Sequence, residues 1–313
     1  KNIHPKNVED WVYVFPNIKN KLKQLWDDGY CITIFSNQRA LEVEPRRTMI
    51  LNRMEAVSKD IDIPMNFILS SKDDEYRKPN TGMFSIIEVM MEVDKSNSFY
   101  VGDAAGRVFN SNRKRDFSAS DRYFALNIGI DFFTPEEYFD QPCDDYYYSD
   151  NIAFDQLKLL KNCHRFNGIT TIQNSVPELI IIVGYPSCGK TTFINKYFPN
   201  YKVNPRSYMH NKIIIDGNNH TKKIREKYIK IAKNNNLSVR CFYLNIDLLI
   251  SRHLNNFRML TQNIPKYKDV VFNTHRKYFE LPEINEGFDN IIYVNFVPIF
   301  ESKEHENIFY KYS

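Results

Sequence analysis

The most specific chemical pattern in the sequence is a glycine-rich stretch that matches G-x-x-x-x-G-K-[ST]: Gly184-Tyr185-Pro186-Ser187-Cys188-Gly189-Lys190-Thr191. It follows the apolar run Leu179–Val183 and leads into Thr192-Phe193-Ile194, as a strand and a helix start require. Glycines let backbone N–H groups turn toward phosphate oxygens, and the helix N-terminus adds positive potential. We expect residues 184–192 to bind ATP, with Lys190 reaching the β- and γ-phosphates and the Thr191 hydroxyl binding Mg²⁺. The alternative is a chance turn between a strand and a helix.

Two further groups follow this loop. Asp216 ends the next apolar segment, Ile213–Asp216, and is a candidate second carboxylate near the metal or the attacking hydroxyl. The alternative is an aspartate that caps the following helix. Arg252 and Arg258 lie six residues apart on an expected helix, so they do not share one face. One of them is a candidate to bind the transferred phosphate while the other is solvated, and a fully solvated helix face is the alternative.

The first half of the chain carries a hydroxyl, a cation and an acid at places where strands are expected to end. Ser36 closes the apolar run Tyr30–Phe35, Lys78 precedes an expected helix, and Asp103 follows the segment 98–102. The carboxyl ends of parallel strands converge on one crevice, so the three side chains are expected to meet there. A hydroxyl donor, a lysine and a carboxylate suit a phosphate held with Mg²⁺, with Asp103 as the metal ligand. Taken singly, each of these residues is common in the turn that follows a strand.

Strand and helix patterns alternate in both halves, which predicts two α/β, Rossmann-like domains with parallel sheets. The expected strands of the first half are 30–35, 66–70 and 98–102, and those of the second are 179–183, 213–216, 239–244 and 291–296. We expect one domain over residues 1–142, a linker with a short helix around 154–160 over 143–176, and a second domain over 177–313.

Composition excludes several classes of protein. Apolar residues make up 42% and charged residues 26% of the 313 residues, which is typical of a soluble globular chain without a membrane span. A net charge of +4 permits a polyanionic partner without requiring one. The five cysteines form no C-x-x-C pair, so a disulfide framework or a zinc site is not expected, and an intracellular, nuclear or cytoplasmic location fits best. A monomer is expected.

The order of motifs resembles one known family. Ser36-Asn37-Gln38, then Arg77-Lys78-Pro79, then Gly102-Asp103-Ala104-Ala105-Gly106-Arg107 is similar to the 3′-phosphatase domain of eukaryotic-type polynucleotide kinase/3′-phosphatases, a branch of the haloacid dehalogenase superfamily. The resemblance continues through Asp116–Asn127 and into the second half. It implies that Ser36 hydrogen-bonds the phosphoryl group, that Lys78 clamps it and that Asp103 binds Mg²⁺. It also implies that Arg258 binds phosphate from a lid, and that the partners are ATP, Mg²⁺ and DNA or RNA ends in strand-break repair.

The sequence departs from the family pattern twice. Family phosphatases carry D-x-D-G-T on the first strand, whereas no such segment occurs here and Lys1–Asp10 resembles the stretch that follows it. We therefore expect an N-terminally truncated phosphatase domain without turnover in the chain as written. Family kinases also place an Asp after the loop helix in an Asn-Arg-Asp context, but here Val203-Asn204-Pro205-Arg206-Ser207 lacks it. A helix before the next strand is also expected to be deleted.

Three hypotheses remain open from the sequence. The first is an end-processing enzyme that removes 3′-phosphates and phosphorylates 5′-hydroxyl ends with ATP. The second is a degenerate, non-catalytic nucleotide- or nucleic-acid-binding homologue, and the third is a small-molecule P-loop kinase joined to an unrelated domain. A smaller hypothesis is that the helix N-terminus lowers the pKa of the Cys188 thiol, so that oxidation there blocks ATP. The alternative is a small residue that is tolerated at a variable position of the loop.

Overall fold

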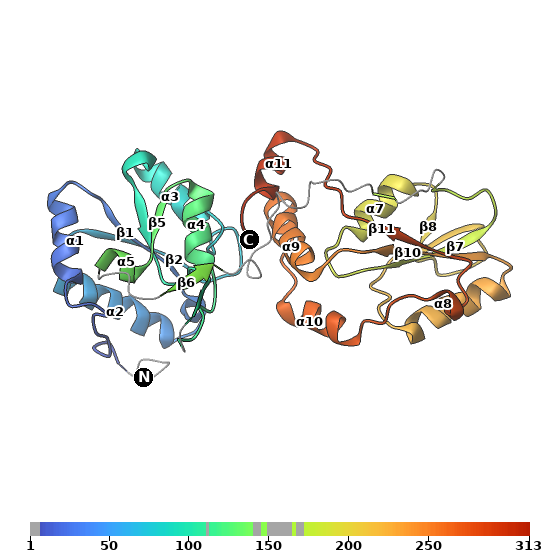
Figure 1. Cartoon of the computed structure of the whole chain (residues 1–313), viewed down its shortest axis with the longest axis horizontal. Helices are drawn as coiled ribbons and strands as arrows, with labels where there is room; N and C mark the ends of the chain where they lie inside the picture. The colour runs from blue at the N-terminus through green and yellow to red at the C-terminus, as the bar shows by residue number, and fades with distance from the viewer. Residues whose placement is uncertain (1–6, 111–112, 140–144, 149–164, 167–171) are drawn as a thin grey trace. The chain divides into compact units, whose positions relative to one another are not determined.

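The computed structural model describes residues 7–110, 113–139, 145–148, 165–166 and 172–313. The chain divides into two compact units (Figure 1). Unit 1 comprises Lys1–Ala153 together with Lys311–Ser313, and unit 2 comprises Phe154–Tyr310. The expectation of two α/β domains is therefore confirmed. The helix expected around 154–160 lies outside the described residues.

The described residues of unit 1 form three pairs of strands. Two pairs are parallel: β1 (Ile32–Asn37) with β2 (Met65–Ser70), and β3 (Phe99–Val101) with β5 (Asp131–Phe133). The third pair, β4 (Arg107–Phe109) with β6 (Tyr146–Tyr148), is antiparallel. The helices are α1 (Ile18–Asp27), α2 (Arg46–Ile61), α3 (Gly82–Met90), α4 (Ser120–Ile128) and α5 (Pro135–Phe139), with short 3-10 turns η1 (Arg39–Glu42) and η2 (Lys95–Asn97).

A cavity of about 1410 Å³ lies between the two parallel pairs, and residues of both β1 and β3 line it. Within the described part of unit 1, hydrogen bonds do not join β1 to β3. The two strands approach through side chains instead, since the rings of Phe35 and Tyr100 have centroids 6.4 Å apart. Ile34 and Phe35 on β1 are accordingly only half-buried. Among the described residues, neither β1 nor β3 is therefore hydrogen-bonded to another strand along the edge that faces the cavity.

Unit 2 is built on one five-stranded parallel sheet with the order β11-β10-β7-β9-β8. Its strands are β7 (Glu178–Val183), β8 (Lys202–Val203), β9 (Lys212–Ile215), β10 (Ser238–Leu244) and β11 (Asn290–Val294). Its helices are α7 (Lys190–Tyr197), α8 (Lys222–Asn234), α9 (Leu248–Gln262), α10 (Asp269–Tyr278) and α11 (Lys303–Phe309), with the 3-10 turn η3 (Ile284–Glu286). All six residues of β7 are buried, because a central parallel strand is covered on both faces.

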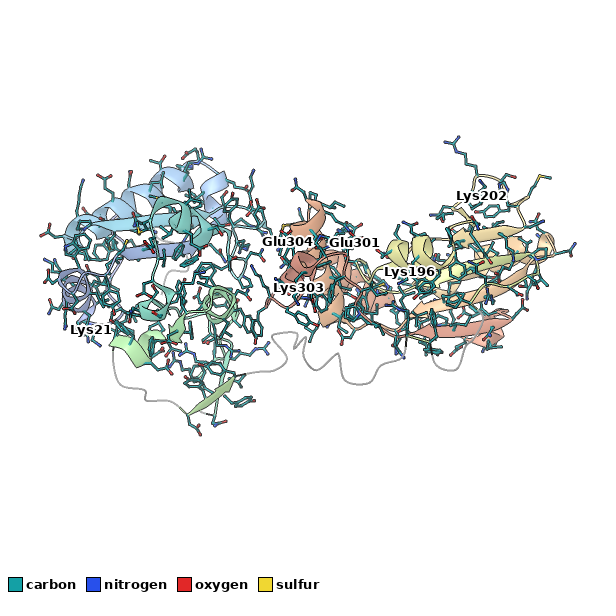
Figure 2. All side chains as sticks on the ribbon, turned by 90° about the horizontal axis from the view of Figure 1, so that it is seen from above. Lys21, Lys196, Lys202, Glu301, Lys303 and Glu304 are labelled. Atoms are coloured by element: carbon teal, nitrogen blue, oxygen red, sulfur yellow. The ribbon has the colours of Figure 1, made fainter. Side chains whose placement is uncertain are left out.

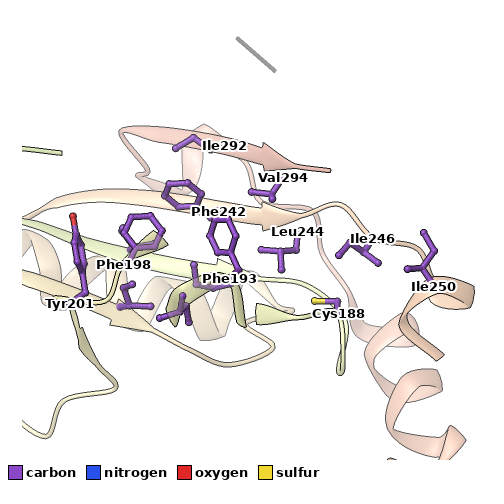
Figure 3. Packing of buried hydrophobic residues seen from close by; sticks show 14 of the residues in the cluster. Cys188, Phe193, Phe198, Tyr201, Phe242, Leu244, Ile246, Ile250, Ile292 and Val294 are labelled. Carbon is purple, nitrogen blue, oxygen red and sulfur yellow. The ribbon is translucent and has the colours of Figure 1, made fainter. Parts of the chain in front are cut away.

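The two faces of this sheet carry separate apolar cores. Ile180 and Ile182 belong to one core, and Leu179, Ile181 and Val183 belong to the other, as the alternation of side chains along a strand requires. In the first core the aromatic rings of Phe193, Phe198 and Phe242 pack together (Figure 3). This packing fixes α7 against the sheet and thereby the loop that precedes it.

Side-chain caps set the starts of the helices that follow β9 and β10. The Thr221 hydroxyl accepts a hydrogen bond from the Ile224 amide at α8, and the Asp247 carboxylate accepts one from the Ile250 amide at α9. Such caps contribute about 1 kcal/mol each. Because Thr221 caps α8, the alternative reading of Asp216 as the cap of the helix after its strand is wrong.

The strands expected from the sequence are confirmed within one or two residues at each end. The two-residue strand β8 was not expected, and it lies where the sequence indicated a deleted helix. Charged side chains such as Lys196 and Lys202 project outward from unit 2 (Figure 2). Among the described helices, none is both long and apolar enough to cross a membrane.

The stability of unit 2 should depend on pH through His253. This residue is 2% exposed and packs edge-on against Phe309, with ring centroids 4.9 Å apart. Burial lowers the pKa of His253 from 6.5 to about 4. Between those values the unfolded chain binds a proton that the folded chain excludes, so stability falls as pH falls from about 6.5 toward about 4. The limiting slope is about 1.4 kcal/mol per pH unit.

Amide hydrogen exchange in β10, measured by mass spectrometry between pH 7 and pH 4.5 and corrected for intrinsic exchange rates, checks this prediction. His253→Gln should reduce the slope, whereas substitution of the exposed His210 by Gln should leave it unchanged. An unchanged slope in His253→Gln would contradict the assignment.

Candidate active sites

In unit 1, the ammonium group of Lys78 is held at the carboxyl end of β1. Its Nζ donates to the Phe35 carbonyl oxygen and to the Tyr100 hydroxyl, each at 2.8 Å. It also lies 2.7 Å from the Asp121 carboxylate, and both side chains of this ion pair are 8% exposed. A buried pair with this many additional hydrogen bonds fixes the cation in one place.

Ser36 is joined to Lys78 through its neighbour Asn37. The Asn37 side-chain oxygen accepts from the Lys78 amide at 3.0 Å, and its Nδ2 donates to the Lys78 carbonyl at 3.2 Å. The Ser36 hydroxyl accepts a hydrogen bond from Gln38 Nε2 at 2.9 Å. Ser36, Lys78 and Asp103 all line the same cavity. The structure therefore places the three residues expected from the sequence on the wall of one cavity.

Asp103 follows β3 and faces a second carboxylate, Asp121. The residue as a whole is exposed, while desolvation of its carboxyl group, followed by repulsion from Asp121, raises the pKa of Asp103. Gly102 permits this close approach, because a Cβ at that position would lie 2.6 Å from the Cβ and Oδ2 of Asp121. Any side chain at residue 102 would therefore displace Asp121 and, with it, the partner of Lys78.

Sequence reasoning missed the role of Asp121. It lies inside the 116–127 segment of the family resemblance, but nothing in its spacing indicates that it pairs with Lys78. The structure places it on the first turn of α4, where its carboxylate also accepts from the Ala104 amide at 3.1 Å. Arg107 was missed likewise: it is 2% exposed and bonds both Asp116 and Glu136. It thereby fixes the loop after Asp103.

In unit 2, the glycine-rich loop has the backbone geometry of a phosphate cradle. Ser187 has φ of +59° and Gly189 has φ of +86°, so the loop turns sharply before α7 begins at Lys190. The Lys190 ammonium folds back over the loop and donates to the Gly184 carbonyl at 3.1 Å and the Tyr185 carbonyl at 2.5 Å. These carbonyl contacts hold the cation at the N-terminus of α7.

Thr191 and Asp216 are neighbours at the carboxyl edge of the sheet. The Thr191 hydroxyl donates to the Asp216 carboxylate at 2.8 Å. Asn204 in turn holds the Asp216 backbone, accepting from its amide at 2.9 Å and donating to its carbonyl at 2.8 Å. Asn204 belongs to the Val203–Ser207 segment, which departs from the family pattern. It thus fixes the position of Asp216, the one acid that the sequence analysis assigned to this site.

Cys188 does not have the reactive character expected from the helix N-terminus. Its side chain is 2% exposed and packs in the apolar core beside Leu244 (Figure 3). Burial raises the pKa of the Cys188 thiol, and the nearby Lys190 only partly offsets this effect. The prediction of a lowered pKa is wrong because desolvation of the thiolate outweighs the helix dipole and the ammonium group.

The two arginines of α9 have different surroundings. Arg252 pairs with Asp269 at 3.0 Å. The guanidinium of Arg258 lies 4.5 Å from the centre of the Tyr267 ring, and its NH2 group is 3.4 Å from the Asn255 side-chain oxygen. Its Nε is buried and has no hydrogen-bond partner among the described residues, and the same holds for Nε of Arg252.

Both sites offer oxygen donors that suit Mg²⁺. In unit 2 the donor is the Thr191 hydroxyl, with the Asp216 carboxylate 2.8 Å away, and in unit 1 the donor is the Asp103 carboxylate, whose repulsion from Asp121 a cation would relieve. Within the described residues no three His, Cys, Asp or Glu side chains form a cluster able to hold a metal ion by themselves. Mg²⁺ that arrives with a phosphate ligand requires only one or two carboxylates from the protein.

Comparison with known proteins gives a consistent result along the chain. Residues 1–139 match the family described as "Polynucleotide kinase 3 phosphatase". A bifunctional polynucleotide phosphatase/kinase of Schizosaccharomyces pombe is 28% identical over 99% of this chain and 79% of its own length. A putative bifunctional polynucleotide phosphatase/kinase of Acanthamoeba polyphaga mimivirus is 28% identical over 94% of this chain and 82% of its own length. An uncharacterized 20.8 kDa protein of Autographa californica nuclear polyhedrosis virus is 40% identical over 43% of this chain and 74% of its own length.

Substitution of Asp121 should destabilise unit 1 strongly. Asp121→Ala leaves the buried Lys78 ammonium without its carboxylate, which typically costs about 3–5 kcal/mol. Both tryptophans of the chain, Trp11 and Trp26, lie in unit 1, so their fluorescence during urea unfolding reports on this unit alone. Glu88→Gln is the matched control: it breaks the exposed Glu88–Lys95 pair and should change stability by at most about 1 kcal/mol. Equal effects of the two substitutions would contradict the structural role of Asp121.

Proposed function

This chain belongs to the polynucleotide kinase 3 phosphatase family, and from that premise we propose that it processes nucleic-acid ends with one phosphate site in each unit. Unit 1 acts on 3′-phosphate ends, and unit 2 phosphorylates 5′-hydroxyl ends. The observation that carries the proposal is the match along nearly the whole chain to relatives named bifunctional polynucleotide phosphatase/kinases. The lysine-centred geometry of both sites supports it.

In unit 2, the phosphate donor is ATP. Its phosphates lie in the cradle of residues 184–192, where Lys190 exchanges its carbonyl partners for β- and γ-phosphate oxygens. Thr191 would hold Mg²⁺, which would neutralise charge on the phosphates. The 5′-hydroxyl oxygen attacks the γ-phosphorus, Asp216 accepts the hydroxyl proton, and ADP leaves. Arg258 donates to the transferred group.

In unit 1, Ser36, Lys78 and Asp103 hold the phosphate and its charge. The Ser36 hydroxyl donates to a phosphoryl oxygen and Lys78 offsets the negative charge, while Asp103 would hold Mg²⁺, which would supply further charge neutralisation. The fixed position of the Lys78 ammonium between Phe35 and Asp121 supports this assignment. The substrates are DNA or RNA ends, and strand-break repair is the process in which such ends arise.

The kinase proposal is tested with a 5′-hydroxyl oligonucleotide, ATP and Mg²⁺. Lys190→Ala should abolish ATP binding and transfer together, whereas Lys196→Ala, on the exposed side of the same helix, should change neither. Asp216→Asn should lower kcat by about 10²–10⁴-fold, as expected for loss of a general base, while ATP affinity changes by less than about threefold.

Two results would contradict the kinase proposal. Phosphorylation of a free nucleoside but not of oligonucleotides would favour a small-molecule kinase. ATP binding without transfer to any acceptor would favour a non-catalytic homologue. If Asp216→Asn lost as much Mg²⁺-dependent ATP affinity as kcat, the Asp216 carboxylate would instead be assigned to the metal.

The proposal for unit 1 is tested by binding, which does not require turnover. Fluorescence anisotropy compares oligonucleotides that end in a 3′-phosphate with those that end in a 3′-hydroxyl. The wild-type chain should prefer the phosphate, and Ser36→Ala should reduce that preference by about tenfold or more, because a hydrogen bond to a charged group is lost. Ser71→Ala, at the end of the neighbouring β2, is the control. A chain without preference for the 3′-phosphate would overturn the proposal.

A further inference from the structure

Asn255 connects three parts of unit 2 that meet at the nucleotide cradle. It lies on α9, two turns after the helix begins, and is 4% exposed. Its carboxamide bonds to Ser187 of the cradle, to Tyr267 in the segment between α9 and α10, and to Arg258 one turn further along α9. A buried amide with this many partners is fixed in one orientation.

The contact with Tyr267 is two-sided. Asn255 Oδ1 accepts from the Tyr267 amide at 3.0 Å, and Asn255 Nδ2 donates to the Tyr267 carbonyl at 3.0 Å. Only a carboxamide supplies an acceptor and a donor in this arrangement. The Tyr267 side chain is 46% exposed, so the amide, more than apolar packing, holds this residue against α9. The ring of Tyr267 then receives the Arg258 guanidinium at 4.5 Å.

The contact with the cradle uses the same oxygen. The Ser187 hydroxyl donates to Asn255 Oδ1 at 3.1 Å, and Arg258 NH2 approaches that oxygen at 3.4 Å. Ser187 has φ of +59°, a conformation that a non-glycine residue adopts only when its surroundings hold it there. Asn255 Oδ1 therefore links Ser187 of the cradle to Arg258, the residue that we assign to the transferred phosphate.

We propose that Asn255 is a positioning residue for phosphoryl transfer: it fixes Arg258 relative to the cradle by binding Ser187 and the Tyr267 backbone at once. This inference rests on the kinase function proposed above and identifies what orients its arginine. Positional errors of about 1 Å in such a group lower rates by about 100-fold. Asn255 contacts Ser187, Tyr267 and Arg258, and its effect on transfer passes through Arg258.

The test is a double-mutant cycle on the full chain with Asn255→Ala, Arg258→Ala and both together. Asn255→Ala should lower kcat by about 10–100-fold with little change in KM for the oligonucleotide. In the Arg258→Ala background the same substitution should change kcat by less than about twofold, because the group that it positions is gone. Additive losses would show a general structural role and overturn the proposal.

Two further variants separate positioning from folding. Asn256→Ala removes the neighbouring amide, which lies 3.4 Å from Lys266 in the same segment, and should leave kcat nearly unchanged. Asn255→Asp keeps the oxygen that Ser187 and Arg258 both use but loses the donor to Tyr267, so its kcat should lie between wild type and Asn255→Ala. An Asn256→Ala effect as large as that of Asn255→Ala would contradict the proposal.

Calorimetric measurement of ATP and ADP binding tests the role of Asn255 independently of the kinase proposal. Arg258 is assigned to the γ-phosphate, so Asn255→Ala should weaken binding of ATP about tenfold more than binding of ADP. If the wild-type chain transfers no phosphate, the kinase proposal fails, and this ratio alone decides the role of Asn255. Equal weakening of ATP and ADP would overturn it.

Discussion

Both sites depend on one kind of interaction: a lysine ammonium held by backbone carbonyl oxygens at the carboxyl end of a parallel strand. Lys78 donates to the Phe35 carbonyl at the end of β1, and Lys190 donates to the Gly184 carbonyl just after β7. A carbonyl is a weaker partner for a cation than a phosphate oxygen. All three N–H donors of Lys78 are engaged, by Phe35, Tyr100 and Asp121, whereas the main partners of Lys190 are neutral carbonyls. In unit 1 the ion pair with Asp121 strengthens the arrangement, whereas in unit 2 the neutral carbonyls leave the cation available to an anion.

The two units surround these lysines in different ways. In unit 2 a continuous sheet with β7 fully buried makes the cradle a rigid extension of the core, and Cys188 and Phe193 tie it to that core. In unit 1 the strand ends of β1 and β3 flank a cavity of about 1410 Å³, and side chains rather than a ladder connect them. The network of Lys78, Tyr100 and Asp121 is therefore what joins the two parallel pairs at the site.

The sequence predicted the parts of this account that rest on local patterns. Apolar runs and the glycine-rich loop identified the strands and the cradle, because burial on both faces and positive φ angles leave strong marks in the residue types. The groups that it missed, Asp121 and Asn255, act through partners distant in the chain: Lys78 in one case, and Ser187 and Tyr267 in the other. The spacing of residues along the sequence does not indicate such contacts. The Cys188 prediction was wrong for a related reason, since its burial by residues such as Leu244 outweighs the local helix dipole.

A crystal structure of the chain with Mg²⁺, a non-hydrolysable ATP analogue and an oligonucleotide that ends in a 3′-phosphate tests the central claim most directly. The account predicts two occupied sites, with the γ-phosphate of the analogue against Lys190 and the 3′-phosphate against Ser36 and Lys78. In the complex, Lys190 should have exchanged the Gly184 carbonyl for phosphate oxygens. A 3′-phosphate bound away from Lys78, or a nucleotide bound outside residues 184–192, would contradict the existence of two lysine-centred phosphate sites.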